Sequence, residues 1–469
     1  MFYFDNYEET SVNNEINSTN LEYIEIKNLF GRHNVKLSFV KEVNVYIGEN
    51  GLGKTTILNC VYYILKKRYA KLAEIEFEAI NIKFKNKNEF HLTSFDINAY
   101  NENRMSKHSP YFDDDYIELI YHSSNGELLD SNTYSSDEEF EMAVRRMARS
   151  TGMSLSFARR QLQRHLINNA YLNNNKEIKR GDYKKVEEFN IALDKLIGQE
   201  ILYLTTYRRI ENDFTNLIGK DEKFRDDMLI RFGMSDVDRS IKNILDLIRE
   251  NSRESFNKMT GVLLKQYALG YKEKNIPYNI DKDMLKIILD RLGSEIIEED
   301  RVKIISLLDS GKIYNDSYSY LLDLISKLIY NYDKQKVYDD KIKNFVKTCN
   351  KYLNGKKFEF NQSDLKLDVK LISDDDMPSS IELTKLSSGE KQIVSLFSKL
   401  YLDNEKNCLL IIDEPELSLS MKWQKMLLPD IMRSGNCKLL LTVTHSPFIF
   451  ENEFDFDAKE MRNCITRSF

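Results

Sequence analysis

A glycine-rich stretch near the start of the chain constrains its fold more than any other feature. Residues 48–56, GENGLGKTT, fit the pattern G-x-x-x-x-G-K-[ST]; the apolar run VNVYI leads into them and a helical pattern follows. Glycines let the backbone curl until its amides point at phosphate oxygens, and the start of the helix adds its positive end. The stretch therefore predicts an α/β fold around a nucleotide. The expected contact residues are Gly48, Glu49, Asn50, Gly51, Gly53, Lys54, Thr55 and Thr56.

Two side chains of this loop have distinct expected roles. Lys54 would reach the β- and γ-phosphates, and the hydroxyl of Thr55 would hold Mg²⁺. A chance glycine-rich turn is the alternative interpretation. The strand before the loop and the helix after it favour the nucleotide site.

A pair of carboxylates ends a strongly apolar run far along the chain. Residues 409–414, LLIIDE, suit a central parallel strand that is buried on both faces. Asp413 would hold magnesium through water, and Glu414 would act as the general base that polarises the attacking water. A strand that merely ends in an acidic turn is the alternative, and the phosphate loop makes the catalytic interpretation the stronger one.

A second apolar run, LLLTVTHSPF at 439–448, ends near His445. A lone histidine is more often structural. This one follows a predicted strand downstream of the carboxylates, which is where a sensor of the γ-phosphate would lie. We therefore expect His445 to act together with Glu414 in catalysis.

A serine-rich loop offers a further anion site. In KLSSGEKQ, the residues Ser387, Ser388 and Gly389 directly precede a helix that should begin near Glu390, and hydroxyls and amides at a helix start bind anions. One chain would not need this site, because residues 48–56 already surround the nucleotide. The loop makes sense if two chains meet head to tail and each offers it to the other's nucleotide.

Composition excludes several classes of protein. The 469 residues include 42% hydrophobic and 30% charged residues, enough apolar material for a large core, and the net charge of −6 provides no global attraction to nucleic acid. The five cysteines show no CxxC or zinc spacing, which indicates unpaired thiols in a reducing compartment. The N-terminus does not resemble a signal peptide, and no run approaches the roughly 18 apolar residues of a membrane helix. We expect a cytoplasmic protein that does not contact a membrane.

The pattern along the chain predicts three parts. Residues 1–215 would form the N-terminal part of the fold with a charged helical excursion at about 136–195, 216–354 a helical insert, and 355–469 the C-terminal part. We expect a helix from Lys54 to about Tyr69, a loop over 100–135 and helices over most of 222–353. The expected strands are 23–29, 34–39, 43–48, 74–84, 89–95, 200–207, 357–361 and 365–372.

The order of the motifs GENGLGKTT, LSSGEKQ, LLIIDEPE and THSP resembles the soluble ABC-type ATPases of the SMC, RecF and OLD group. The resemblance covers about 22–75 and 355–450. It implies an α/β ABC-type head, with a phosphate loop, a mixed sheet and a helical insertion, that hydrolyses ATP to ADP and phosphate with Mg²⁺. It also implies a head-to-tail dimer. This family usually has a glutamine after the strand at 200–207, where this chain has YRRIE; Arg208 and Arg209 could contact phosphate or a partner there. Ser420 stands where relatives often have histidine.

Within this group, LYLTTYRRIE, IRFGMSDV and LSSGEKQIVSLFSKLYL are similar to the stand-alone ATPases of anti-phage systems, with the PARIS system first and Septu second. This resemblance implies a nucleotide-gated sensor or scaffold of the toxin–antitoxin kind, in a dimer or a larger oligomer such as a hexamer of dimers. It would control a separate Toprim-type nuclease and answer to a phage-encoded trigger protein. Because few residues follow Pro447 in this sequence, we expect the nuclease to be a separate protein.

A cluster of arginines in the middle region leaves two interpretations open. A solvated helical face is the simpler one, and a surface for DNA or an acidic protein is the other. The cluster consists of Arg145, Arg146, Arg149, Arg159, Arg160 and Arg164. Beside the defence role, a RecF- or SMC-like ATPase of DNA repair or recombination and a scaffold that binds ATP only to assemble also remain open.

Overall fold

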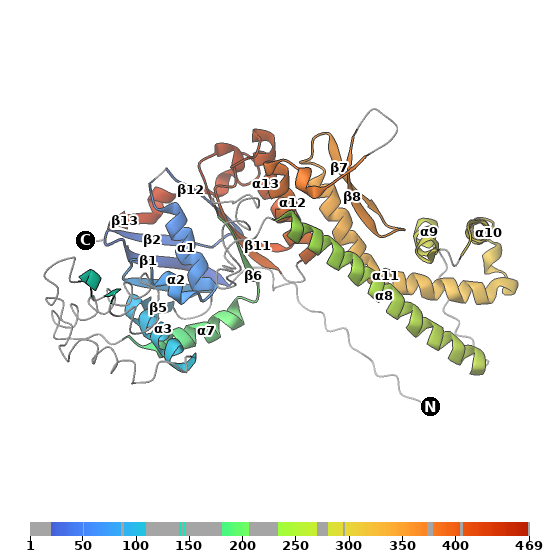
Figure 1. Ribbon diagram of the computed structural model, residues 1–469, viewed down its shortest axis with the longest axis horizontal. Coiled ribbons are helices and arrows are strands. Elements are labelled where there is room, and N and C mark those ends of the chain that lie inside the picture. Colours follow the sequence, from blue (N-terminus) through green and yellow to red (C-terminus); the bar gives the residue numbers. More distant parts are fainter. Residues whose placement is uncertain are drawn as a thin grey trace. The chain divides into compact units, whose positions relative to one another are not determined.

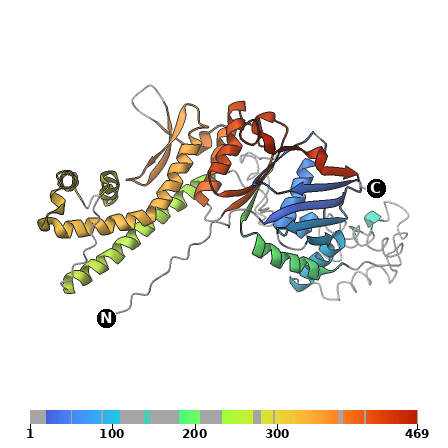
Figure 2. The ribbon, with the colours of Figure 1, turned by 180° about the vertical axis from the view of Figure 1, so that it is seen from behind.

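The computed structural model describes residues 20–49, 51–85, 89–108, 140–142, 144–145, 181–205, 233–269, 280–293, 296–372, 379–403 and 407–467 (Figures 1 and 2). Contacts between Cα atoms divide the chain into two compact units. Unit 1 contains the described parts of Lys41–Leu58 and Gly198–Arg462. Unit 2 contains those of Asn20–Val40, Asn59–Ile197 and Asn463–Phe469.

Unit 1 is built on a five-stranded parallel sheet in the order β12-β3-β11-β10-β6. The three central strands are almost continuously apolar and buried, as expected for a parallel sheet that is covered on both faces. The strands are β3 (Val43–Ile47), β6 (Glu200–Leu204), β10 (Cys408–Asp413), β11 (Cys437–Thr444) and β12 (Ala458–Glu460).

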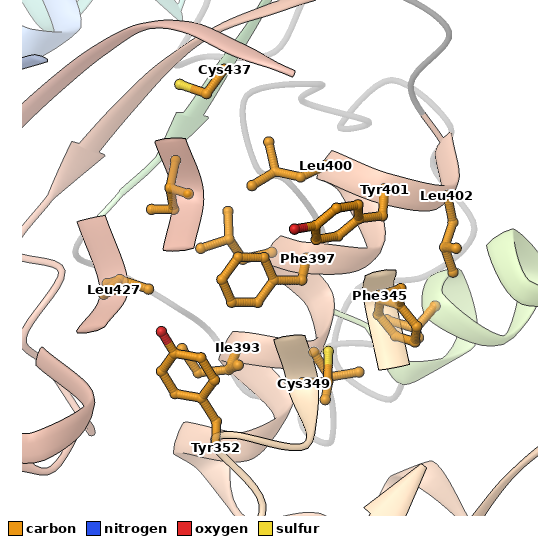
Figure 3. Packing of buried hydrophobic residues seen from close by; sticks show 14 of the residues in the cluster. Phe345, Cys349, Tyr352, Ile393, Phe397, Leu400, Tyr401, Leu402, Leu427 and Cys437 are labelled. Atoms are coloured by element: carbon orange, nitrogen blue, oxygen red, sulfur yellow. The ribbon is translucent and has the colours of Figure 1, made fainter. Parts of the chain in front are cut away.

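Two helices of the C-terminal part pack into the main core of unit 1. α12 (Ser388–Ser398) is buried at nearly every position from Gly389 onward, and a π-helical turn, Lys399–Asp403, continues it. α13 (Met421–Arg433) follows β10. Figure 3 shows how Phe397, Leu400 and Tyr401 pack with residues of neighbouring segments. This packing fixes α12 and the turn after it within the main core of unit 1.

A helical insertion separates β6 from the C-terminal part of unit 1. Two long helices, α8 (Met234–Leu269) and α11 (Ser319–Cys349), lie side by side along it (Figures 1 and 2). α9 (Lys282–Arg291), α10 (Glu298–Asp309) and two 3₁₀ turns, Lys312–Tyr314 and Asp316–Tyr318, complete it. A separate small core of six aliphatic residues, including Leu285, Ile313 and Leu322, holds these shorter elements to α11. A three-stranded sheet of β7 (Lys356–Asn361), β8 (Lys366–Leu371) and β9 (Ser380–Ile381) follows.

Unit 2 contains a second five-stranded sheet in the order β13-β2-β1-β4-β5, with antiparallel neighbours throughout. Its strands are β1 (Leu21–Leu29), β2 (His33–Ser38), β4 (Ala79–Phe84), β5 (Glu89–Thr93) and β13 (Ile465–Arg467). Its described helices include α2 (Tyr69–Leu72), α3 (Ser94–His108) and α7 (Tyr183–Leu196). Phe84 and Phe90 pack on Phe189 of α7, which fixes this helix to the sheet.

The predicted fold class, an α/β head with a helical insertion, is confirmed, and strands form in all eight expected segments. The expected helix from Lys54 is shorter: α1 (Lys54–Leu65) ends before Lys67, whose φ of 57° is left-handed. The loop expected over 100–135 is wrong for 100–108, because α3 extends to His108; 109–135 lies outside the described residues. Reciprocal hydrogen bonds between Thr93 and Asp96 cap the start of α3.

No helix in the described part of the chain is long and apolar enough to cross a membrane.

A buried ion pair ties the helical insertion together. One guanidinium nitrogen of Arg291 on α9 donates to both carboxylate oxygens of Asp339 on α11, at 2.9 and 2.8 Å, and its Nε donates to the carbonyl of Gln362. The hydroxyl of Tyr332 also donates to Asp339, at 2.9 Å. Asp339 is fully buried. Burial raises the pKa of Tyr332, and the Asp339 charge adds to this effect.

We predict that Asp339→Ala lowers the free energy of unfolding by about 3–5 kcal/mol, because it leaves the Arg291 charge buried without its partner. Urea unfolding followed by circular dichroism measures this loss. Glu254→Ala is the matched control, since it removes an exposed i,i+4 pair with Lys258 on α8 and should change the stability little. Equal losses in the two variants would contradict the assignment.

Candidate active site

The parallel sheet of unit 1 brings distant motifs to one edge. β3, β10 and β11 run in the same direction, so their carboxyl ends lie at the same side of the sheet. β3 leads into the glycine-rich loop, β10 ends at Asp413, and β11 ends just before His445. Residues that are hundreds of positions apart in the sequence therefore become neighbours.

The glycine-rich loop folds around the ammonium group of Lys54. Lys54 Nζ donates to the carbonyls of Gly48 at 2.9 Å and Glu49 at 3.3 Å, and it lies against Nε2 of His445. A Cβ atom on Gly48 would lie 2.7 Å from Cδ of Lys54, so only glycine allows this approach. Gly51 and Gly53 have φ angles of 88° and 71°, which L-residues rarely adopt. The loop thus requires its glycines.

The environment of Lys54 combines burial with nearby negative charge. Lys54 is only 6% exposed to solvent. Burial lowers the pKa of the ammonium group below its ordinary value, and the neighbouring carboxylates, Glu414 foremost, oppose this shift. The site therefore holds a cation close to several acidic groups.

Thr55 and Asp413 meet across 358 positions of sequence. Thr55 Oγ1 donates to Asp413 Oδ2 at 2.6 Å, and Asp413 is fully buried at the end of β10. A hydroxyl and a carboxylate are both hard oxygen donors, and Mg²⁺ takes few such protein ligands beside water and phosphate oxygens. The donor set of these two residues therefore fits magnesium.

Glu414 and His445 lie close to each other at the same edge of the sheet. Nε2 of His445 lies 3.6 Å from Oε1 of Glu414, and both side chains are partly exposed, at 32% and 22%. The φ angle of Glu414 is 51°, a left-handed conformation that is uncommon for a residue other than glycine and that clusters at functional sites. Its backbone N–H donates to the carbonyl of Val443 at 2.9 Å, which links the two strand ends.

The serine loop starts a buried helix. Ser387 is the N-cap of α12: its hydroxyl accepts the N–H of Glu390, and its own N–H donates to the Glu390 carboxylate at 2.7 Å. Lys356 also donates to this carboxylate, at 2.8 Å. Burial alone would raise the pKa of Glu390, but these hydrogen bonds outweigh it and lower the pKa. The helix begins at Ser388, two residues earlier than predicted.

Ser387 and Ser388 are exposed, whereas Gly389 is buried. A Cβ atom on Gly389 would lie 2.4 Å from the carbonyl oxygen of Ser418, so the glycine lets α12 pack against the loop after β10. Within the described residues, no hydrogen bond or ion pair joins 387–389 to Lys54, Thr55 or His445 of the same chain. Over the described residues, the serine loop and the phosphate loop of one chain therefore do not form a single hydrogen-bonded site.

Sequence reasoning missed Glu416, Gln424 and Thr444. The carboxylate of Glu416 accepts hydrogen bonds from the N–H of His445 at 2.7 Å and from the hydroxyl of Thr444 at 2.8 Å. The second glutamate of DEPE was the available signal for Glu416, although nothing in the local pattern says which atoms its carboxylate contacts.

The other predicted residues are placed as follows. Glu49 is exposed, Thr56 is half-buried in the first turn of α1, and Arg145 is exposed in a short described helical segment. The remaining predicted residues lie outside the described parts of the chain, so their roles stay predictions. They are Asn50, Arg146, Arg149, Arg159, Arg160, Arg164, Arg208 and Arg209.

Comparison with known proteins gives one extensive match in sequence. The profile of the AAA ATPase domain family matches residues 20–450. No curated protein sequence matches the chain. The solved structures that resemble it weakly include an Smc head domain with an extended coiled coil bound to the C-terminal domain of ScpA, derived from Pyrococcus furiosus (13% identity, TM-score 0.34), and an SmcHead bound to the C-winged helix domain of ScpA (10% identity, TM-score 0.33).

The two alignments cover 96% of this chain and 96% and 97% of the solved chains, but their TM-scores are too low to support an argument about function. The family match is different in kind, because it spans most of the chain and includes the phosphate loop, the serine loop, the acidic strand end and His445. The chain belongs to the AAA ATPase domain family.

Proposed function

We propose that this protein is a magnesium-dependent ATPase that hydrolyses ATP to ADP and phosphate. The convergence of Lys54, Thr55, Asp413, Glu414 and His445 at one edge of the parallel sheet is the observation that carries this proposal. These are a phosphate-binding cation, two oxygen donors suited to magnesium, a general base and a polar group beside it. The family match supports the same reaction.

The residues of the site divide the work of hydrolysis among them. Lys54 would exchange the carbonyls of Gly48 and Glu49 for the β- and γ-phosphate oxygens. Thr55 and Asp413 would hold Mg²⁺, which would neutralise charge on the phosphates. Glu414 would accept the proton of the attacking water, and His445, beside it, would contact the γ-phosphate.

We further propose a head-to-tail dimer as the active form. Ser387 and Ser388 are exposed at the start of a buried helix, where backbone N–H groups and the helix dipole favour an anion. Among the described residues this loop makes no hydrogen bond to Lys54 or His445 of its own chain, so the anion that it would contact is a phosphate of the nucleotide bound by a second chain. Each nucleotide would then be held by the phosphate loop of one chain and the serine loop of the other.

The biological role is proposed from the resemblance of the motifs. The first proposal is a cytoplasmic sensor or scaffold in anti-phage defence that controls a separate Toprim-type nuclease and responds to a phage-encoded protein, in a dimer or a larger oligomer. A RecF- or SMC-like role in DNA repair is the second, and salt-sensitive DNA binding would favour it. Negligible turnover with ATP-dependent assembly would favour a scaffold.

Lys54→Ala should weaken the binding of MgATP about 10- to 100-fold, because it removes hydrogen bonds from a charged group to the phosphates, and should abolish phosphate release. Isothermal titration calorimetry and a phosphate-release assay measure these two effects. Lys66→Ala, which changes an exposed lysine just after α1, should behave like the unchanged protein. Unaltered ATP affinity in Lys54→Ala would refute the assignment of the phosphate loop.

Glu414→Gln should trap a dimer in the presence of MgATP, because proton removal from water stalls while the phosphate contacts remain. Size-exclusion chromatography with light scattering should show the dimer with ATP and not with ADP. Adding Ser388→Arg should prevent the dimer while MgATP still binds, since Ser388 lies on the exposed serine loop. If Glu414→Gln elutes identically with and without ATP, the head-to-tail arrangement is wrong.

A further inference from the structure

The loop between β10 and α13 carries a carboxylate for which the proposed reaction has no direct use. Glu416 lies two residues after Glu414. Its Oε1 accepts the backbone N–H of His445 at 2.7 Å, and its Oε2 accepts the hydroxyl of Thr444 at 2.8 Å. Both oxygens therefore bind the chain where β11 ends. Hydrogen bonds to a carboxylate are shorter and stronger than those to a neutral acceptor.

The loop that carries Glu416 is itself fixed by Gln424 of α13, a buried polar residue. Nε2 of Gln424 donates to the carbonyl of Leu419 at 2.9 Å, and its Oε1 accepts the hydroxyl of Ser446 at 2.6 Å. The segment around His445 is thus held on both sides, by Glu416 before it and by Gln424 after it. Neither contact involves the imidazole ring.

The backbone of the same loop is unusual at two positions. Glu414 and Ser418 have φ angles of 51° and 64°, although neither is glycine. Each such conformation costs of order 1–3 kcal/mol and persists only where surrounding contacts impose it. These two residues flank Glu416. The turn that contains them directs the Glu416 carboxylate toward the end of β11. The conformation of the loop therefore places Glu416 where it can bind Thr444 and His445.

We propose that Glu416 is a positioning residue that fixes the backbone of His445, and through it the imidazole beside Lys54 and Glu414. This role rests on the proposed ATPase function of the site. Glu416 does not touch the reacting atoms; it determines where His445 Nε2 lies. A shift of about 1 Å in such a group can cost roughly 100-fold in rate.

Three variants separate hydrogen bonding from charge. Glu416→Ala should lower kcat about 100-fold and change the KM for ATP less than about 3-fold, because Lys54 and the phosphate loop hold the phosphates in the ground state, whereas the contact of His445 with the γ-phosphate acts mainly in the transition state. Glu416→Gln should recover most of the lost turnover: its carbonyl oxygen can still accept the His445 N–H, and its amide can donate to Thr444 Oγ1. The control, Glu451→Ala, removes an exposed ion pair with Lys425 and should leave turnover unchanged. Equal losses in the Ala and Gln variants would overturn the proposal.

A double-mutant cycle tests whether Glu416 acts through His445. Glu416→Ala should lower turnover little in a His445→Ala background, because residues that act as a unit are not additive. If Glu416→Ala costs the same factor in both backgrounds, Glu416 does not act through His445 and the proposal falls.

Hydrogen exchange supplies a measurement that needs no ATP. By mass spectrometry, the peptide around 443–446 of the nucleotide-free protein should exchange faster in Glu416→Ala than in the unchanged protein, since the His445 N–H loses its acceptor. Unchanged exchange would overturn the positioning role. If the unchanged protein hydrolyses no ATP, the proposed function fails, and the exchange result alone decides whether Glu416 holds His445.

Discussion

The site depends on the parallel pairing of β3, β11 and β10. Parallel strands present their carboxyl ends at one edge of a sheet, so the glycine-rich loop, the acidic strand end and His445 meet there although the chain between them is long. The strands are apolar enough to be buried on both faces, and their register pairs Asp413 with Val443 and Thr444 with Ile47. A shift in this register would separate Thr55 from Asp413 and Lys54 from His445.

The polar groups at this edge hold one another in place through direct contacts. Lys54 is bound by loop carbonyls and His445, Thr55 by Asp413, and the backbone of His445 by Glu416. Dipoles and charges that are already fixed act on a ligand with little reorganisation. The low exposure of Lys54 itself explains why burial lowers the pKa of its ammonium group in spite of the carboxylates around it.

Buried polar contacts also organise the parts of unit 1 that lie away from the site. Arg291 and Asp339 join α9 to α11, and Asp430 of α13 accepts hydrogen bonds from Lys351 and Tyr352 just after α11. Such contacts are costly when incomplete, so they favour one arrangement of the helices over others. α11, one of the two long helices of the insertion, is thereby anchored to α13 and to the core that holds the sheet and α12.

The sequence by itself determined the α/β class, the approximate positions of the strands and long helices, and the motif residues of the site, because periodicity and glycine spacing are local properties. It did not reveal that α3 begins at Ser94 or that Gly389 packs against Ser418. Nor did it reveal that Glu416 holds His445, a contact between residues 29 positions apart. Only the tertiary structure decided these contacts, because they follow from how β10 and β11 pair and where α12 and α13 pack, and no local pattern records that geometry.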